Sequence, residues 1–223
     1  MNASRAPYQA VIFDWDGTLL DSTHHIVGAL IGACQDLGLK VPSPEEAGWV
    51  IGLSLQAALY QLAPELPASE ADTFAEHYKT HYRRLMHELH LFQGQAQLLQ
   101  ELHGYGVVLG VATGKSRRGL DTSIQSLGLQ GLFQATRTVD EARGKPDPDM
   151  LEQLLAELEL AQDAVLMVGD TTHDVLMAKA AGIDSLAVSY GAHRASLLQT
   201  SQPTALVHSV AEMQAWVRSS VRI

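Results

Sequence analysis

Short, unbroken runs of apolar residues recur along the chain, and the first three lead into segments rich in glycine, threonine or aspartate. An alternating apolar–polar pattern would predict strands with one face in water, whereas unbroken runs predict parallel strands that are covered on both faces. We therefore expect buried parallel strands at Ala10–Phe13, Val107–Ala112, Ala164–Val168, Ser185–Val188 and Ala205–Val207.

Between these runs the apolar residues recur every three or four positions, which is the spacing of an amphipathic helix. Gly128 and Gly182 follow two of these stretches, where glycine commonly ends a helix. Strands that alternate with helices predict an α/β fold with a Rossmann-like parallel sheet and right-handed crossovers. These helices are expected at Gln95–Leu102, Arg117–Leu127, Pro148–Leu158 and Thr172–Ala181.

The stretch between the first two strands departs from this alternation. From Ser22 to about His90 it contains no convincing strand, and prolines separate three helical patterns at Ile26–Leu37, Leu55–Leu62 and Glu70–Leu89. A block of roughly 70 residues of this kind is typical of an inserted helical domain. We expect residues 1–21 and 91–223 to form the α/β core and residues 22–90 to form the insertion.

Composition narrows the class of protein. The chain has 223 residues and a formal net charge of −10, so sequence-independent binding to nucleic acid or anionic membranes is not expected. No apolar run approaches the ~18 residues of a spanning helix, and the N-terminal segment has no secretory pattern, so a cytoplasmic location is expected. The single cysteine, Cys34, excludes an intrachain disulfide and a multi-cysteine zinc site.

The pentapeptide Asp14-Trp15-Asp16-Gly17-Thr18 directly follows the first predicted strand. Ligands of open parallel sheets bind outside the carboxyl ends of the strands. In extended chain Asp14 and Asp16 would point the same way and could share one site. The same residues also fit an ordinary Asp-Gly turn, so this motif alone leaves both interpretations open.

A second pair of carboxylates follows another predicted strand. Asp170 and Asp174 are four residues apart at the start of a helix, so both can face one point. Either residue alone could simply cap that helix. Two strands that bring acids to one sheet edge instead favour a hard cation with oxygen ligands. His173 lies between the two acids, and we interpret it as incidental because such a site needs no imidazole.

Two further strand-edge residues could bind an anion. Thr113 ends a predicted strand and precedes Gly114 and Lys115, and Lys145 precedes Pro146 shortly before a predicted helix. Proline-rich helix starts are common without function, so Lys145 alone is a weak signal.

These pieces in this order resemble the haloacid dehalogenase-like hydrolase superfamily, and the Gly-Lys-Pro-Asp-Pro and Gly-Asp-Thr-Thr-His-Asp segments resemble its phosphoglycolate phosphatase-like branch. The resemblance implies that residues 22–90 form a cap domain. It also implies Asp14 as the nucleophile that becomes an aspartyl-phosphate, and Asp16 as the proton donor and acceptor. Thr113, Gly114 and Lys145 would bind the phosphoryl group, although many relatives have asparagine where this chain has Gly114. Mg²⁺ would sit on Asp14, the Asp16 backbone carbonyl and Asp170, with Asp174 supporting.

The resulting hypothesis is a Mg²⁺-dependent phosphatase that hydrolyses a small phosphorylated metabolite, with phosphoglycolate as the substrate that the resemblance suggests. A sugar phosphate, a nucleotide or pyrophosphate is an alternative substrate. A haloacid dehalogenase is less favoured because that reaction needs neither Asp16 nor Mg²⁺, and a non-catalytic binding protein is favoured least because every catalytic position is filled. The oligomeric state is left open.

Overall fold

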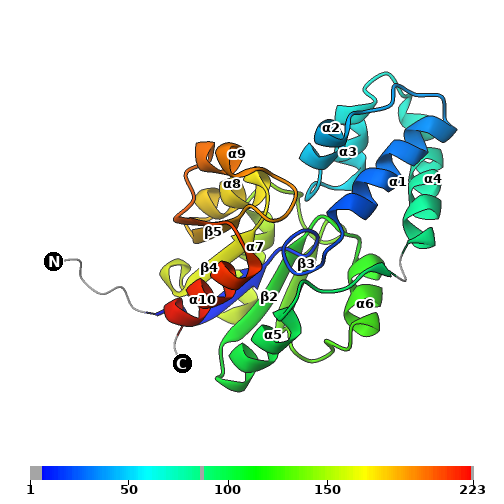
Figure 1. The fold of residues 1–223 in the computed structure, drawn as a ribbon. Helices are drawn as coiled ribbons and strands as arrows, with labels where there is room; N and C mark the ends of the chain where they lie inside the picture. The colour runs from blue at the N-terminus through cyan, green and yellow to red at the C-terminus, as the bar shows by residue number, and fades with distance from the viewer. Residues whose placement is uncertain (1–6, 86–87, 222–223) are drawn as a thin grey trace.

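The computed structural model describes residues 7–85 and 88–221 and has the α/β architecture that the sequence predicts (Figure 1). Six parallel strands form one sheet in the order β3-β2-β1-β4-β5-β6, which is the order of the doubly wound Rossmann fold. The strands are β1 (Ala10–Phe13), β2 (Val108–Thr113), β3 (Ala135–Thr138), β4 (Val165–Gly169), β5 (Asp184–Val188) and β6 (Ala205–Val207).

Both faces of the sheet are covered, which explains the unbroken apolar runs. In β1, Val11 and Phe13 project into one buried cluster, and Ala10 and Ile12 project into another on the opposite face. The first cluster is completed by α5 (Gln95–Gly104), α6 (Arg117–Ser126) and α10 (Val210–Ser220). The second is completed by α7 (Asp149–Leu158) and α8 (Thr172–Ala180), and α9 (Ala195–Thr200) packs beside α8.

The structure also contains elements that the pattern did not predict: β3, α9, α10, the helix Pro44–Trp49 and short 3-10 helices at Ala68–Glu70 and Gln162–Ala164. β3 has the sequence Ala-Thr-Arg-Thr and lies at the edge of the sheet, and its two central residues are only half-buried. The helix predicted over 70–89 ends at Arg84, and the part of that prediction at Met86 and His87 lies outside the described residues, as does the N-terminal segment 1–6.

Helices α1 to α4 lie together beside the carboxyl ends of the strands (Figure 1). They have an apolar cluster of their own around Ile26, Leu30 and Phe74, separate from the clusters of the sheet. We call this helical group the insertion; its boundaries at residues 22 and 90 stay a prediction. Its elements are α1 (Thr23–Asp36), α2 (Pro44–Trp49), α3 (Leu55–Leu62), the 3-10 helix Ala68–Glu70 and α4 (Ala71–Arg84).

The insertion joins the core through two segments that run side by side. Leu20 and Leu91 form an antiparallel bridge. The backbone N–H of Phe92 donates to the carbonyl of Leu19 at 3.0 Å, and that of Asp21 donates to the carbonyl of residue 90 at 3.0 Å. The chain therefore enters and leaves the insertion at neighbouring points.

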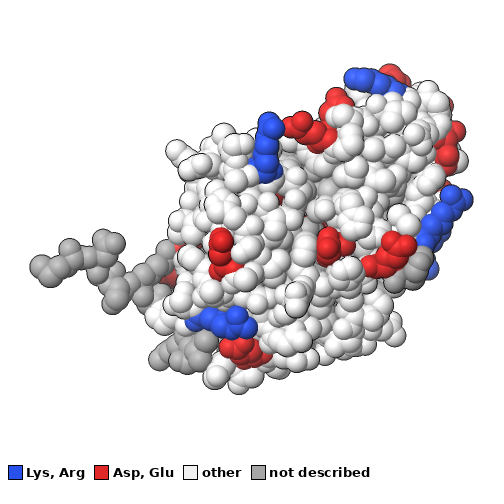
Figure 2. Space-filling model, in the orientation of Figure 1, with Lys and Arg blue, Asp and Glu red and all other residues white. Residues whose placement is uncertain are grey.

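The described part of the chain contains no helix that is long and apolar enough to cross a membrane. On the face drawn in Figure 2, Lys and Arg side chains lie singly, interspersed with Asp and Glu. The expectations about nucleic acid and membrane partners stay predictions.

Candidate active site

Three strands deliver the predicted site residues to one edge of the sheet. Asp14 follows β1 directly, Thr113 is the last residue of β2, and Asp170 follows β4. Because β1 pairs in parallel with both β2 and β4, these strand ends lie side by side, where open α/β sheets bind ligands. Lys145 reaches the same place from the loop before α7, and Asp174 reaches it from the first turn of α8.

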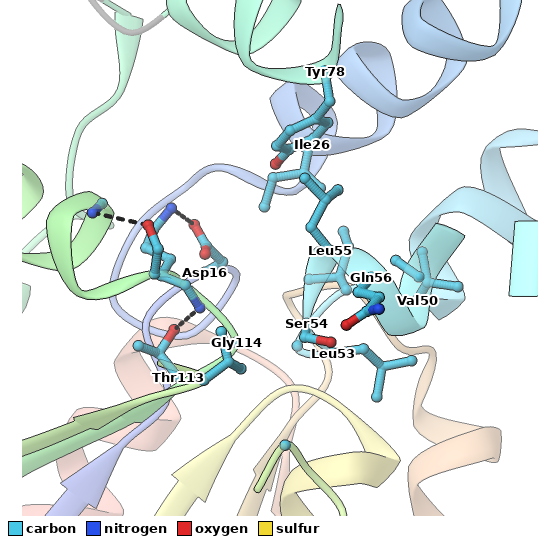
Figure 3. Close-up of a pocket in the computed structure, with 18 of the residues that line it drawn as sticks. Asp16, Ile26, Val50, Leu53, Ser54, Leu55, Gln56, Tyr78, Thr113 and Gly114 are labelled. Carbon is cyan, nitrogen blue, oxygen red and sulfur yellow. Dashed lines mark hydrogen bonds and ion pairs between the residues drawn. The ribbon is translucent and has the colours of Figure 1, made fainter. Parts of the chain in front are cut away.

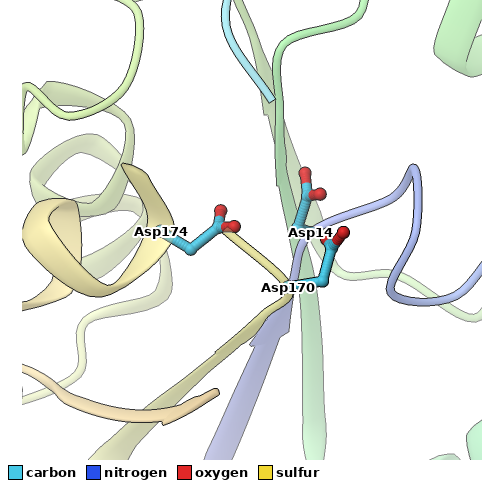
Figure 4. A group of neighbouring side chains, drawn as sticks. All are labelled: Asp14, Asp170 and Asp174. Atoms are coloured by element: carbon cyan, nitrogen blue, oxygen red, sulfur yellow. The ribbon is translucent and has the colours of Figure 1, made fainter. Parts of the chain in front are cut away.

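Asp14, Asp170 and Asp174 form a buried carboxylate group (Figure 4), in which each residue offers an oxygen atom within 4.8 Å of the others. Burial, together with Asp174 and Asp170, raises the pKa of Asp14 well above its ordinary value, although Lys145 opposes this shift. Burial and the neighbouring Asp174 also raise the pKa of Asp170 to about 7. Like charges held together in a buried place favour a nearby cation.

The ammonium group of Lys145 is one such cation. Its Nζ atom lies 2.6 Å from Asp14 Oδ1 and 2.6 Å from Asp174 Oδ1, and the side chain is fully buried. Burial alone would lower the pKa of Lys145, but the two carboxylates outweigh this effect and the pKa lies above its ordinary value. Lys145 is therefore a fixed positive charge in contact with Asp14.

Hydrogen bonds orient the other two carboxylates. Thr18 Oγ1 donates to Asp170 Oδ1 at 2.8 Å, and a backbone N–H from the loop after β5 donates to Oδ2 at 2.6 Å. Asp174 Oδ2 accepts from the backbone N–H of Thr171 at 3.0 Å and from its hydroxyl at 2.7 Å, as part of the capping box that begins α8. Since Asp174 Oδ1 contacts Lys145, both oxygens of Asp174 are engaged and the residue positions the lysine.

The carboxylate of Asp16 is not a member of this group. Ser22 Oγ donates to Asp16 Oδ1 at 2.7 Å, and Lys115 Nζ lies 3.0 Å from the same oxygen. Lys115 also donates to the hydroxyl of Tyr82 on α4 at 3.1 Å, so it joins Asp16 to the insertion. Asp14 and Asp16 thus line the same cavity, although their carboxylates have different partners. A metal contact through the Asp16 backbone carbonyl stays a prediction.

Gly114 lies close to the insertion. A side chain at this position would collide with the backbone carbonyl oxygens of Gly52 and Leu53, in the turn between α2 and α3. A side chain such as that of asparagine would therefore not fit at this position without a shift of the turn. Gly114 and Thr113 line the same cavity as Asp14, so the strand end and the turn of the insertion meet over the site.

Two histidines make a further contact between core and insertion that the motifs did not reveal. The Nε2 atoms of His173 and His193 lie 3.0 and 3.1 Å from the carbonyl oxygen of Trp49, at the end of α2, and both donate to it. The backbone N–H of Thr172 donates to His193 Nδ1 at 3.0 Å, which fixes the neutral tautomer. Burial lowers the pKa of both histidines, in keeping with neutral rings. His173 is outside the carboxylate group and contacts the insertion instead.

A divalent cation fits the carboxylate group. Asp14 Oδ2 is buried and has no hydrogen-bond partner among the described residues. Carboxylate oxygens are the donors that Mg²⁺ prefers, and the one Lys145 charge leaves excess negative charge in the group. Asp14 and Asp170 are the residues that would hold the ion, with Asp174 beside them.

A cavity of about 510 Å³ opens between the strand ends and the insertion. Asp16, Thr113 and Gly114 lie on one side, and side chains of α1, α3 and α4 lie across from them (Figure 3). The nucleophile candidate Asp14 also lines this cavity. A bound molecule would therefore touch the core at one end and the insertion at the other.

Comparison with known proteins identifies the family. The chain matches the sequence profile of haloacid dehalogenase-like hydrolases over residues 11–188. It is 35% identical to the probable phosphatase IndB of Dickeya dadantii, with 91% of this chain and 90% of that protein covered. It is 30% identical to a phosphoglycolate phosphatase of Vibrio cholerae, over 86% of this chain and 89% of that protein. The chain belongs to the haloacid dehalogenase-like hydrolases.

A solved structure agrees with this assignment. The haloacid dehalogenase-like family hydrolase of Streptococcus pneumoniae superposes with a TM-score of 0.78 at 26% identity, with 94% of this chain and 98% of that chain covered. The α/β fold with its parallel sheet is thus the fold of this family, as the resemblance implied.

Proposed function

We propose that the protein is a Mg²⁺-dependent phosphatase that hydrolyses a small phosphomonoester through an aspartyl-phosphate on Asp14. The observation that carries the proposal is the buried Asp14 carboxylate, which has one oxygen on Lys145 and one without a hydrogen-bond partner among the described residues. The names of the Dickeya and Vibrio relatives support phosphate ester hydrolysis.

In the first step, a carboxylate oxygen of Asp14 attacks phosphorus and the bond from phosphorus to the ester oxygen breaks. The products are an acyl phosphate on Asp14 and an alkoxide, which takes a proton from the carboxyl group of Asp16. Lys145 offsets the charge of the phosphoryl oxygens, and Thr113 donates a hydrogen bond to one of them. Ser22 and Lys115 hold the Asp16 carboxyl from the side.

In the second step, water attacks phosphorus and the bond to Asp14 breaks, which releases inorganic phosphate and restores the Asp14 carboxylate. Asp16, now ionised, accepts the proton of that water and is ready for another cycle. Both protons are thus accounted for by one carboxyl group.

Asp14 and Asp170 would hold the Mg²⁺ ion, and Asp174 would support the site by positioning Lys145. When bound, the ion supplies positive charge that offsets the phosphate charge as Asp14 approaches. The residues themselves orient the nucleophile, bind the phosphoryl oxygens and move the proton.

Chelation with EDTA should inactivate the enzyme, and added Mg²⁺ should restore activity. The reason is that Mg²⁺ is held by few protein ligands, and without it the negative carboxylate group faces a phosphate dianion. Release of p-nitrophenol from p-nitrophenyl phosphate measures the effect. Asp170→Ala should need more Mg²⁺ for half activation or be inactive. Full activity in EDTA would refute the metal assignment.

Gly114→Ala should lower kcat/KM for p-nitrophenyl phosphate by about tenfold, because the added methyl group pushes against the carbonyls of Gly52 and Leu53. Overpacking of this kind costs about 1–3 kcal/mol. Gly28→Ala is the matched control, since a methyl group there meets no atom within 4 Å. Equal kcat/KM values for the two variants would show that activity does not depend on the close contact between Gly114 and the turn at Gly52 and Leu53.

We propose a small phosphorylated metabolite as the partner, without nucleic acid or membrane, and the cytoplasm as the location. The net charge of −10 supports the expectation that neither nucleic acid nor an anionic membrane is a partner. Phosphoglycolate, which the Vibrio relative's name suggests, belongs in a substrate screen with sugar phosphates, nucleotides and pyrophosphate.

A further inference from the structure

We propose that the leaving group of the substrate is an uncharged alcohol with a largely apolar body, rather than a carboxylate or a second phosphate. This inference rests on the proposed phosphatase function and concerns the part of the cavity beyond Asp14.

The wall that the insertion contributes is mostly apolar. Its apolar side chains are Ile26 of α1, Val50 at the end of α2, Leu53 of the following turn, Leu55 of α3 and the ring of Tyr78 from α4. Figure 3 shows these side chains grouped across the cavity from Asp16, Thr113 and Gly114. Ser54 and Gln56 add neutral polar groups at the same wall. A molecule held by its phosphate at the strand ends would extend its alcohol part toward this apolar surface.

Every cation that the described residues bring to the cavity already lies against a carboxyl group. Lys115 Nζ lies 3.0 Å from Asp16 Oδ1, and Lys79 Nζ lies 2.8 Å from Glu76 Oε1. Lys145, at the strand ends, lies between Asp14 and Asp174. The remaining lining residues in the described part of the chain include neither arginine nor histidine.

An anionic group on the alcohol part would therefore lose its hydration without gaining a free positive partner. A buried polar group left unsatisfied costs about 1–3 kcal/mol and a charged one costs more. Asp140, which also lines the cavity, would repel such a group. An uncharged apolar chain has no such cost and gains from burial against Ile26 and Leu55.

The size of the cavity agrees with this conclusion. Its volume of about 510 Å³ falls within the ~300–1,000 Å³ typical of sites for drug-sized ligands. The two-carbon acid released from phosphoglycolate would leave most of the apolar wall uncovered. A longer, neutral body would cover it and exclude water from Asp14.

A pair of substrates that differ in one group tests the proposal: n-butyl phosphate and 4-phosphonooxybutanoate, in which a carboxylate replaces the terminal methyl group. The ester carbon is the same in both, so the reactivity of the leaving oxygen is nearly matched. We expect kcat/KM to be about 30- to 100-fold higher for n-butyl phosphate. Equal values, or a preference for the carboxylate, would overturn the inference while the phosphatase function stands.

Activity on p-nitrophenyl phosphate separates the two hypotheses. Its absence with wild-type enzyme and Mg²⁺ would refute the proposed function, and the inference with it. Turnover of p-nitrophenyl phosphate without turnover of n-butyl phosphate would refute only the apolar leaving group.

Leu55→Arg should reduce the ratio of kcat/KM for n-butyl phosphate to kcat/KM for 4-phosphonooxybutanoate at least tenfold. The reason is that it places a cation at the half-buried start of α3, in the wall of the cavity. Leu55→Met keeps the volume and the apolar character and is the matched control. Gln56→Arg, at an exposed position on the same turn, serves if thermal unfolding shows that Leu55→Arg does not fold. An unchanged ratio of kcat/KM values in a folded arginine variant would show that this wall does not select the substrate.

Discussion

Asp14→Asn should lower kcat by at least ~10³-fold, the scale seen when one member of a catalytic unit is removed. The amide keeps the size of the side chain but cannot form the acyl phosphate, so the covalent step is lost. The measurement is release of p-nitrophenol at saturating substrate and Mg²⁺, with thermal unfolding recorded for the same preparation.

Asp163→Asn is the matched control for this variant, because Asp163 is an exposed carboxylate before β4 and is remote from the carboxylate group. It should keep wild-type activity. If Asp14→Asn or Asp14→Ala retained more than a tenth of wild-type kcat, the covalent route would be wrong.

Lys145→Ala should reduce kcat/KM by about 10²–10³-fold, since losing one group aimed at transition-state charge costs ~2.7–4 kcal/mol. The variant also leaves Asp14 and Asp174 without the cation that lies 2.6 Å from each of them. Breaking a buried ion pair in this way costs about 3–5 kcal/mol of folding stability. Activity is therefore compared at a temperature where circular dichroism shows the variant folded.

Lys115→Ala should lower kcat/KM less than Lys145→Ala does, because Lys115 contacts Asp16 and Tyr82 rather than the nucleophile. Lys179→Ala, on the exposed end of α8 with a neutral partner, is the control for loss of a lysine. If Lys115→Ala were the more damaging variant, the phosphoryl group would have to be reassigned to the turn after β2.

The strands that are buried on both faces were predictable from the sequence. A strand covered on both faces, such as β1 or β4, is apolar throughout, and this signal survives without knowledge of its neighbours. β3 lies at the sheet edge and has the polar sequence Ala-Thr-Arg-Thr, so its strand character depends on pairing with β2. No local pattern carries that information.

The positions of Asp14 and Asp170 were predictable because each directly follows a strand, and parallel strands end at one edge. The contact of Trp49 with His173 and His193 was not, since it joins segments 124 and 144 residues apart. The acceptor is a backbone carbonyl, which leaves no trace in residue identity. The separate partners of Asp16 likewise depend on Lys115 and Ser22, whose side chains the motif does not specify.

Because Leu20 and Leu91 pair where the chain enters and leaves the helical insertion, the insertion can be exchanged as a unit. Its two ends are neighbours in space, so a longer, shorter or different helical unit can occupy the same gap without changing the register of any strand. The apolar wall over the cavity can thus vary while the carboxylates and Lys145 keep their places in the core. A chimera that carries a relative's segment between residues 21 and 91 would transfer the choice of alcohol and leave the phosphoryl chemistry with the host.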